Sequence, residues 1–267
     1  MAGFLLDLRI ALLNLVEHRR RTIFLGAAIA VATCAFVVMS ALSAGVVQSV
    51  LETATALSTG HLNVGGFFKV TAGQVAPLVA DYPRLSTVIE KSTPELELAV
   101  VRGRGLAKVI SDQGSFETAI YGVDIAREPK LQRSLSLLSG SMEGLAEPNA
   151  IMIFDAHAKK LGVRVGDALT ITAQTPRGAA NTVDCHVVAV ARDVGMLSQW
   201  SVFVPNDVIR ALYQLNAQTA GVIQLHLKPE HLQELPAVAA RLRKGLARAG
   251  YRIMPADTRP SWMKWQA

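Results

Sequence analysis

Residues 23–47 read IFLGAAIAVATCAFVVMSALSAGVV, and the rest of the chain is interpreted around this stretch. It contains no charge; the nearest charged residues are Arg21 before it and Glu52 after it. A bilayer core requires about 20 apolar residues of helix, and lipid admits only helices and closed barrels. We therefore predict one transmembrane helix over residues 22–47, with a buried core helix of a soluble protein as the alternative.

The basic residues around this helix set its predicted orientation. Arg19, Arg20 and Arg21 precede it directly, whereas the next basic residue after it is Lys69. Basic residues that flank a first membrane helix stay on the cytoplasmic side. We therefore predict a cytoplasmic N-terminus, a bacterial inner (cytoplasmic) membrane location and a periplasmic main domain. The alternative is a cleaved signal peptide, but its apolar region spans only about 7–15 residues.

The segments next to the membrane helix carry three further predictions. Apolar spacing over residues 1–21 predicts a cytoplasmic, interfacial amphipathic helix, or else an extension of the membrane helix. Gly26 and Ala30 are four residues apart, share a helix face and predict packing against other membrane helices. The helical period continues past Gln48 as a stalk to about residue 58. The tail 259–267 is predicted to be juxtamembrane because it holds two tryptophans and a lysine, or else to be disordered.

The charge of the 267-residue chain lies mostly at its ends. The formal net charge is +6, with +2 on residues 1–21, +6 on residues 241–267 and −2 on the remainder. A nucleic-acid-binding domain carries a basic face on its folded body, so we expect no nucleic-acid partner. Basic ends suit contact with lipid head groups. An ordinary solvated helix face is the alternative for the C-terminal charges.

Short apolar patterns predict an α+β extracytoplasmic domain with two lobes. Residues 48–95 and 220–258 would form a stalk and a helix-plus-strand lobe, and residues 96–219 a strand-rich lobe inserted into it. Pro83 would stop a helix over residues 71–82, and Asn206 would cap a helix over residues 207–213. Gly162 would end a helix over residues 156–161, and Gly250 would end a last helix in which Leu235, Val238, Leu242 and Leu246 share one face. Strands are predicted at 61–64, 88–89, 96–101, 106–110, 116–123, 150–153, 168–173, 182–191, 202–204, 222–227 and 251–254. The strands at 168–173 and 182–191 would form a β-hairpin, because the second alternates strongly.

No catalytic pattern stands out in the sequence. There is no Gly-x-x-x-x-Gly-Lys-Ser/Thr phosphate loop and no Gly-x-Ser-x-Gly nucleophile elbow, and the six histidines lack metal-ligand spacing. His61 would lie on the solvent face of its strand. Cys34 lies in the predicted membrane helix and Cys185 far outside it, so they cannot form a disulfide. We expect no catalytic residue, cofactor or metal; an enzyme with scattered catalytic residues is the alternative.

Several stretches, in order along the chain, resemble one family. NL at 14–15 and RRRT at 19–22, followed by the Ala- and Gly-rich span, resemble the start of ABC transporter permeases of the lipoprotein-releasing and macrolide-exporter type. GHLNV at 60–64 is similar to a stretch of the lipoprotein-releasing branch. Further resemblances are YGVD at 121–124, AKKLGVRVGD at 158–167 and VFVP at 202–205.

The resemblance implies a non-catalytic subunit of a mechanotransmitting transporter. Such permeases have four membrane helices, with the periplasmic domain between the first two. They pair with a second permease and a cytoplasmic ABC ATPase, and the lipoprotein-releasing branch passes lipoprotein cargo to a periplasmic carrier. The last three helices have no counterpart here, so we expect a split or truncated N-terminal half, or a fragment, with ATP hydrolysis in a partner chain. The alternative is a single-pass anchored periplasmic binding or adaptor module without an ATPase partner.

Overall fold

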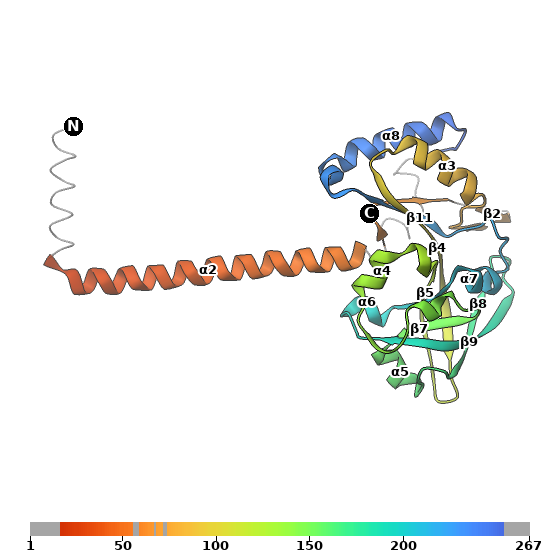
Figure 1. The fold of residues 1–267 in the computed structure, drawn as a ribbon, viewed down its shortest axis with the longest axis horizontal. Coiled ribbons are helices and arrows are strands. Elements are labelled where there is room, and N and C mark those ends of the chain that lie inside the picture. The colour runs from red at the N-terminus through yellow and green to blue at the C-terminus, as the bar shows by residue number, and fades with distance from the viewer. Residues whose placement is uncertain (1–16, 56–58, 67, 72–73, 254–267) are drawn as a thin grey trace. The chain divides into compact units, whose positions relative to one another are not determined.

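A computed structural model describes residues 17–55, 59–66, 68–71 and 74–253, and it divides the chain into two compact units, residues 1–53 and 54–267. The first unit is dominated by α2 (Arg19–Ala54), a continuous helix (Figure 1). At 1.5 Å per residue its 36 residues extend about 54 Å, more than the roughly 30 Å of a hydrocarbon core. Residues 19–48 form the one candidate membrane span found in the described part of the chain.

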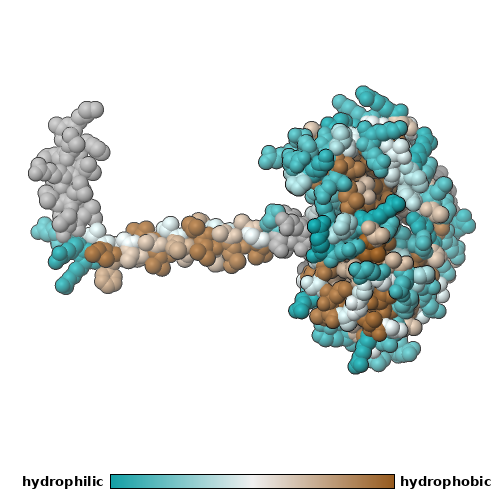
Figure 2. Space-filling view, viewed as in Figure 1, coloured by the Kyte–Doolittle hydropathy of each residue, from teal (hydrophilic) through white to brown (hydrophobic). Residues whose placement is uncertain are grey.

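The side chains described along α2 are almost all solvent-exposed within the protein itself. Phe24, Val31 and Phe36 are among its large exposed apolar residues, and Figure 2 shows hydrophobic residues along the helix beyond its basic start. A helix that is apolar on all sides and unburied requires a nonpolar surrounding. The predicted interfacial helix lies mostly outside the described residues, although its last residues, 19–21, are part of α2.

The second unit is an α+β domain built on one nine-stranded sheet (Figure 1). The strand order is β1-β11-β4-β5-β10-β7-β9-β6, and β8 pairs with both β4 and β9. The strands are β1 (Leu62–Gly65), β4 (Leu96–Ile110), β5 (Ser115–Val123), β6 (Leu137–Gly140), β7 (Ala150–Phe154), β8 (Ala168–Gln174), β9 (Ala180–Ala191), β10 (Ser201–Pro205) and β11 (Val222–Leu227), and a separate pair is β2 (Phe68–Thr71) with β3 (Gln74–Ala76).

The helix-plus-strand lobe packs α3 (Tyr82–Ser92) and α8 (Leu235–Arg248) on one face of β1, β11 and the first half of β4. Figure 1 shows these two helices side by side. The apolar faces of α3 and α8 pack against Ile223 and Leu225, two alternate residues of the buried strand β11. The core of the lobe comprises Val79, Leu85, Ile89, Ala220, Ile223, Leu225, Leu242 and Leu246. The 3-10 helix η4 (Pro229–Glu234) leads into α8.

The strand-rich lobe has a core on each face of its sheet. On one face lie α5 (Asp155–Leu161) and α7 (Asn206–Tyr213), which contribute Leu161 and Leu212. On the other lie α4 (Pro129–Ser134) and two 3-10 helices, η2 (Ile125–Arg127) and η3 (Glu143–Ala146). A short helix, α6 (Met196–Gln199), precedes β10. Because both faces are covered, β7 is buried along its whole length.

These elements confirm the predicted fold class of an apolar N-terminal helix followed by a two-lobed α+β domain. The hairpin of β8 and β9 was predicted correctly. So was the end of α5 at Gly162, whose φ of 65° lies in the left-handed region that favours glycine. The predicted tail 259–267 lies outside the described residues.

The helix predicted at residues 71–82 and the strand predicted at 88–89 are wrong. Within the range 71–82, Thr71 is the last residue of β2 and Gln74–Ala76 form β3, whereas α3 begins at Tyr82 and includes residues 88–89. The Asp81 carboxylate accepts a hydrogen bond from the Arg84 backbone N–H at 3.3 Å, which caps the new helix. Proline is compatible with a helix in its first turn, so Pro83 starts α3 rather than ending an earlier helix. The described residues 251–253 also form no strand.

Candidate functional site

The junction of the two lobes is the candidate functional site, and one strand runs through it. The sequence predicts separate strands at 96–101 and 106–110, but they are one strand, β4, of 15 residues. Up to Arg102 it pairs with β11, and from Gly103 onward it pairs with β5. The predicted lobe boundary at residue 96 is the first residue of β4, whereas the strand changes partner between Arg102 and Gly103. The two lobes are therefore joined by the continuous backbone of one strand.

Asn206 holds β4 at this change of partner. Its side-chain Oδ1 accepts a hydrogen bond from the Gly103 backbone N–H at 2.6 Å, and its Nδ2 donates to the Val101 carbonyl at 2.9 Å. The Gly221 N–H donates to the Arg102 carbonyl at 2.9 Å. Backbone groups that lose a ladder partner must be satisfied otherwise. The prediction that Asn206 caps a helix is wrong: it is the first residue of α7, and its side chain makes no capping bond.

Glycines in β4 and β5 let α7 approach the junction closely. A Cβ at Gly103 would lie 2.8 Å from atoms of Ile209, and one at Gly122 would lie 2.6 Å from the Asn206 Oδ1. The Tyr213 hydroxyl, at the other end of α7, donates to the Leu106 carbonyl at 2.7 Å. Burial raises the pKa of Tyr213 to about 12, so this donor keeps its proton. Helix α7 is thus fixed to β4 at both of its ends.

A buried ion pair crosses the junction from the opposite side. The Arg102 Nε donates to Glu128 Oε2 at 3.0 Å, and each side chain is only 1 % exposed. Glu128 Oε1 also accepts from the Asp124 backbone N–H at 3.3 Å. Burial raises the pKa of Glu128, and the Arg102 guanidinium opposes that shift. The pair ties β4, where it leaves the helix-plus-strand lobe, to the segment that leads into α4.

Two histidines lie among the polar residues of the junction. The rings of His61 and His226 lie with centroids 5.5 Å apart in an edge-to-face arrangement. His226, on β11, is buried; burial, with Lys130 next in effect, lowers its pKa to about 4. Lys130 Nζ, on α4, is paired with Glu97 Oε2, on β4, at 2.6 Å. The junction therefore gathers acidic, basic and imidazole groups from β4, β11 and α4.

The Gly60-His61 dipeptide has a local structural role that the sequence did not reveal. Gly60 has a φ of 58°, and its close approach to β11 leaves a Cβ only 3.1 Å from that of Gln224. His61 Nδ1 accepts a hydrogen bond from the Leu227 backbone N–H at 2.9 Å. The side chain is half-buried, so the prediction of a solvent-face residue is wrong. The imidazole completes the hydrogen bonding of β11 where β1 begins.

The sequence-predicted site residues all lie in α2. Arg19, Arg20 and Arg21 form its first turn and are exposed or nearly so. Gly26 and Ala30 lie one turn apart and are exposed, and a Cβ at Gly26 would meet nothing within 4 Å. The structure leaves their orienting and packing roles as predictions.

The described residues offer little for a metal or a thiol-based reaction. They contain no group of three or more His, Cys, Asp or Glu side chains that could hold a metal ion. Cys34 and Cys185 are free. Cys185 is buried, and burial raises the pKa of its thiol to about 12, which keeps it protonated and unreactive.

An apolar helix of membrane-spanning length followed by a folded α+β domain is the architecture of a membrane-anchored protein. The model of the MacB-like periplasmic core domain family matches residues 23–245. The chain belongs to this family. It carries the periplasmic domain of an ABC-type transporter permease, a class of subunit that is generally non-catalytic.

The solved structures to which the chain is similar include the following three. They are the extracellular domain of the noncanonic ABC-type transporter YknZ from Gram-positive bacteria, a domain of a permease protein from Porphyromonas gingivalis and the periplasmic region of MacB from Actinobacillus actinomycetemcomitans. Their sequence identities are 12 %, 20 % and 12 %, and their TM-scores are 0.45, 0.38 and 0.45. The matches cover 62 %, 60 % and 67 % of this chain and 84 %, 75 % and 80 % of the respective structures. No protein of curated function matches significantly.

Proposed function

We propose that the chain acts as a permease subunit of a mechanotransmitting ABC transporter whose ATP hydrolysis occurs in a cytoplasmic partner chain. The observation that carries this proposal is the continuity of β4 through the junction, reinforced by Asn206 and by the Arg102–Glu128 pair. A subunit that transmits motion needs stiff connections between its parts, and it needs no reacting groups. The family match supplies the transporter context.

The cargo we propose is a lipoprotein released from the inner membrane to a periplasmic carrier. The support is the resemblance of GHLNV at 60–64 to the lipoprotein-releasing branch, together with the fixed position of Gly60 and His61 beside β11. The proposed topology places Arg19, Arg20 and Arg21 in the cytoplasm and the α+β domain in the periplasm. Membrane helices of a second permease subunit would cover the apolar surface of α2, together with membrane lipid.

Copurification of the tagged full chain in a mild detergent tests the assembly. An ABC ATPase and a polytopic permease in the eluate support the proposal. Recovery of periplasmic proteins alone supports the other candidate, an anchored adaptor module. For the cargo, depletion of the chain from its host should leave lipoproteins in the inner-membrane fraction. Normal lipoprotein sorting together with loss of a small-molecule efflux activity would point to export of the macrolide type.

The topology has its own test. Ser139 is exposed on β6, whereas Cys185 is buried and its thiol stays protonated. The proposed topology places the other cysteine, Cys34, within the bilayer, so Ser139→Cys supplies a reactive probe over a low background. A membrane-impermeant maleimide applied to cells with a permeabilised outer membrane should label this variant. If labelling requires disruption of the inner membrane, the α+β domain lies in the cytoplasm and the proposed orientation is wrong.

A further inference from the structure

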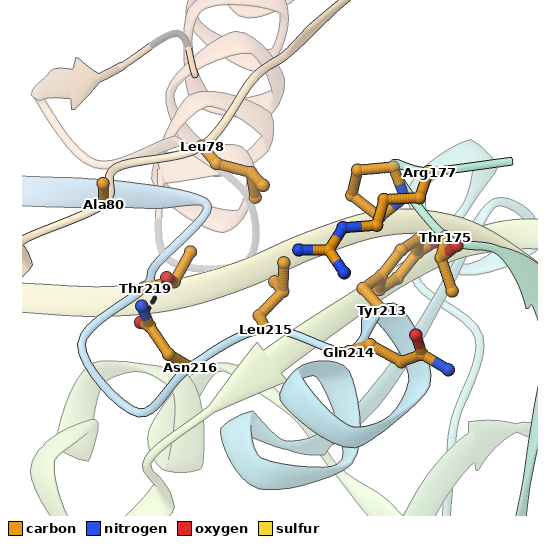
Figure 3. A pocket seen from close by; sticks show the side chains of 10 residues that line it. Leu78, Ala80, Thr175, Arg177, Tyr213, Gln214, Leu215, Asn216 and Thr219 are labelled. Carbon is orange, nitrogen blue, oxygen red and sulfur yellow. Dashed lines mark hydrogen bonds between the residues drawn. The ribbon is translucent and has the colours of Figure 1, made fainter. Parts of the chain in front are cut away.

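A cavity of about 260 Å³ lies where the two lobes approach each other, away from the ion pair of the junction. Leu78, from the segment before α3, forms the wall on the side of the helix-plus-strand lobe. The turn between β8 and β9 and the end of α7 form the other side, with Pro176, Tyr213 and Leu215 (Figure 3). Most of this lining is apolar. Ligand sites are typically concave and apolar with a few polar groups, and this cavity is slightly smaller than their usual range of roughly 300–1,000 Å³.

A cation lies over this apolar cavity. Arg177 belongs to the tight turn in which the Gly178 N–H donates to the Thr175 carbonyl at 2.8 Å. Figure 3 shows its guanidinium reaching between Leu78 and Leu215. No ion pair to Arg177 occurs among the described residues, where the other ion pairs involve different arginines, lysines and histidines. A guanidinium binds carboxylates through two parallel N–H donors, so it offers a charge complement for one anionic group.

We propose that this cavity binds a small monocarboxylate with an apolar body. The one guanidinium, that of Arg177, matches one carboxylate, and Leu78, Leu215 and the Tyr213 ring would cover the aliphatic or aromatic part. The ligand would contact both lobes at once, since Leu78 belongs to one and Arg177 to the other. Binding would thus favour one arrangement of the lobes. The proposal requires neither an ATPase nor a lipoprotein, so it stands apart from the proposed transport function.

The test uses the full chain in lipid nanodiscs, with 4-phenylbutyrate as the probe and 4-phenylbutan-1-ol as its uncharged counterpart. Calorimetric or ligand-observed NMR titrations are corrected with empty nanodiscs, which removes partition into lipid. Wild type should bind the acid saturably and more tightly than the alcohol. Arg177→Gln should weaken binding of the acid roughly tenfold or more and leave the alcohol unchanged, because only the charge-assisted bond is lost.

Arg192→Gln is the matched control, since Arg192 is an exposed arginine just after β9 and outside the cavity lining. It should bind both probes as wild type does. Equal unfolding midpoints of the two variants and wild type would show that all three are folded. Absence of saturable binding of the acid to wild type at millimolar concentration would overturn the proposal. So would equal binding of the acid by wild type and Arg177→Gln.

Discussion

The guanidinium of Arg102 and the carboxylate of Glu128 form an ion pair from which water is excluded, although the residues lie 26 positions apart in the chain. Arg102 is the last residue of β4 that pairs with β11, and Glu128 directly precedes α4. The cost of desolvating the two charges offsets much of the stability that their attraction provides. Loss of one partner, however, leaves an uncompensated buried charge. The pair therefore specifies how the segment 124–134 is seated on the sheet.

Glu128→Gln should lower the free energy of unfolding by about 3–5 kcal/mol, because Arg102 would remain charged and buried. Chemical denaturation of the full chain in detergent, followed by circular dichroism, measures the change. Glu97→Gln is the control: Glu97 also pairs with a basic residue, Lys130, but its side chain is 41 % exposed. That variant should lose at most about 1 kcal/mol. Equal effects of the two variants would show that burial of the Arg102–Glu128 pair has no energetic weight.

Replacing both partners by apolar residues should restore much of the stability. In the double variant Arg102→Met/Glu128→Leu no buried charge is left unpaired, and apolar substitutes of similar size often equal a buried ion pair. Its loss in unfolding free energy should be smaller than that of Glu128→Gln alone, a non-additive result typical of contacting residues. A loss equal to the sum of the two single losses would contradict this account.

His226 should make the stability of the domain depend on pH. Its pKa in the folded protein is about 4, below its ordinary value of 6.5, chiefly because of burial. As the pH falls below 6.5, the unfolded chain binds a proton that the folded protein does not bind until about pH 4. The stabilising contribution is therefore complete above pH 6.5 and is lost as the pH falls toward 4, by up to about 3 kcal/mol.

Denaturation at a series of pH values, with wild type compared to His226→Gln, isolates this contribution. Lys130, Glu97, His61 and Arg102 surround the imidazole and remain in both proteins. Below pH 6.5 the wild-type curve should fall more steeply than that of the variant. His186→Gln, which alters a histidine whose side chain is 40 % exposed on β9, should follow the wild-type curve. Parallel curves for wild type and His226→Gln would rule out the burial effect.

Asn206→Ala should destabilise the domain by about 1–3 kcal/mol, because it leaves the Gly103 N–H and the Val101 carbonyl without partners at a part-buried position. The same denaturation experiment applies. Asn63→Ala, on the exposed side of β1, should change the unfolding free energy by less than about 0.5 kcal/mol. Hydrogen exchange adds a local readout: the amide of Gly103 should lose protection in Asn206→Ala. Unchanged protection there would contradict the role given to Asn206.

Local patterns in the sequence were sufficient for much of the fold. Alternation predicted the β8–β9 hairpin, Gly162 the end of α5, and the spacing of Val238, Leu242 and Leu246 the buried face of α8. Each of these features depends on neighbours within a few turns or across one short loop. Pro83 led to a wrong prediction because a proline can follow the last residue of a helix or stand in the first turn of one. Only the capping hydrogen bond of Asp81 shows that a helix begins here.

The candidate site could not be predicted in the same way. Gly103 and Asn206 lie 103 residues apart, and their hydrogen bond exists only because α7 packs on β4. A single asparagine before a helix predicts an N-cap, and the residues next to Asn206 in the sequence do not indicate that its side chain bonds to a distant backbone segment. The glycines at 103, 105 and 122 were the available signal, since glycines repeated within strands indicate a close backbone approach. The proposed carboxylate cavity likewise combines segments that are far apart in the sequence.

The double variant Gly26→Leu/Ala30→Leu should weaken the association of α2 with other membrane helices. These small residues share one face, and a Cβ at Gly26 would lie within 4 Å of no atom of the described residues, so bulk added there is expected to clash with a partner helix. Yields of copurified permease should drop several-fold while the α+β domain keeps its unfolding midpoint. Val31→Leu/Ala35→Leu, which adds bulk to a different face of the same helix, is the control and should leave the yield near that of wild type. Undiminished recovery of partners with Gly26→Leu/Ala30→Leu would mean that another face of α2 makes the contact.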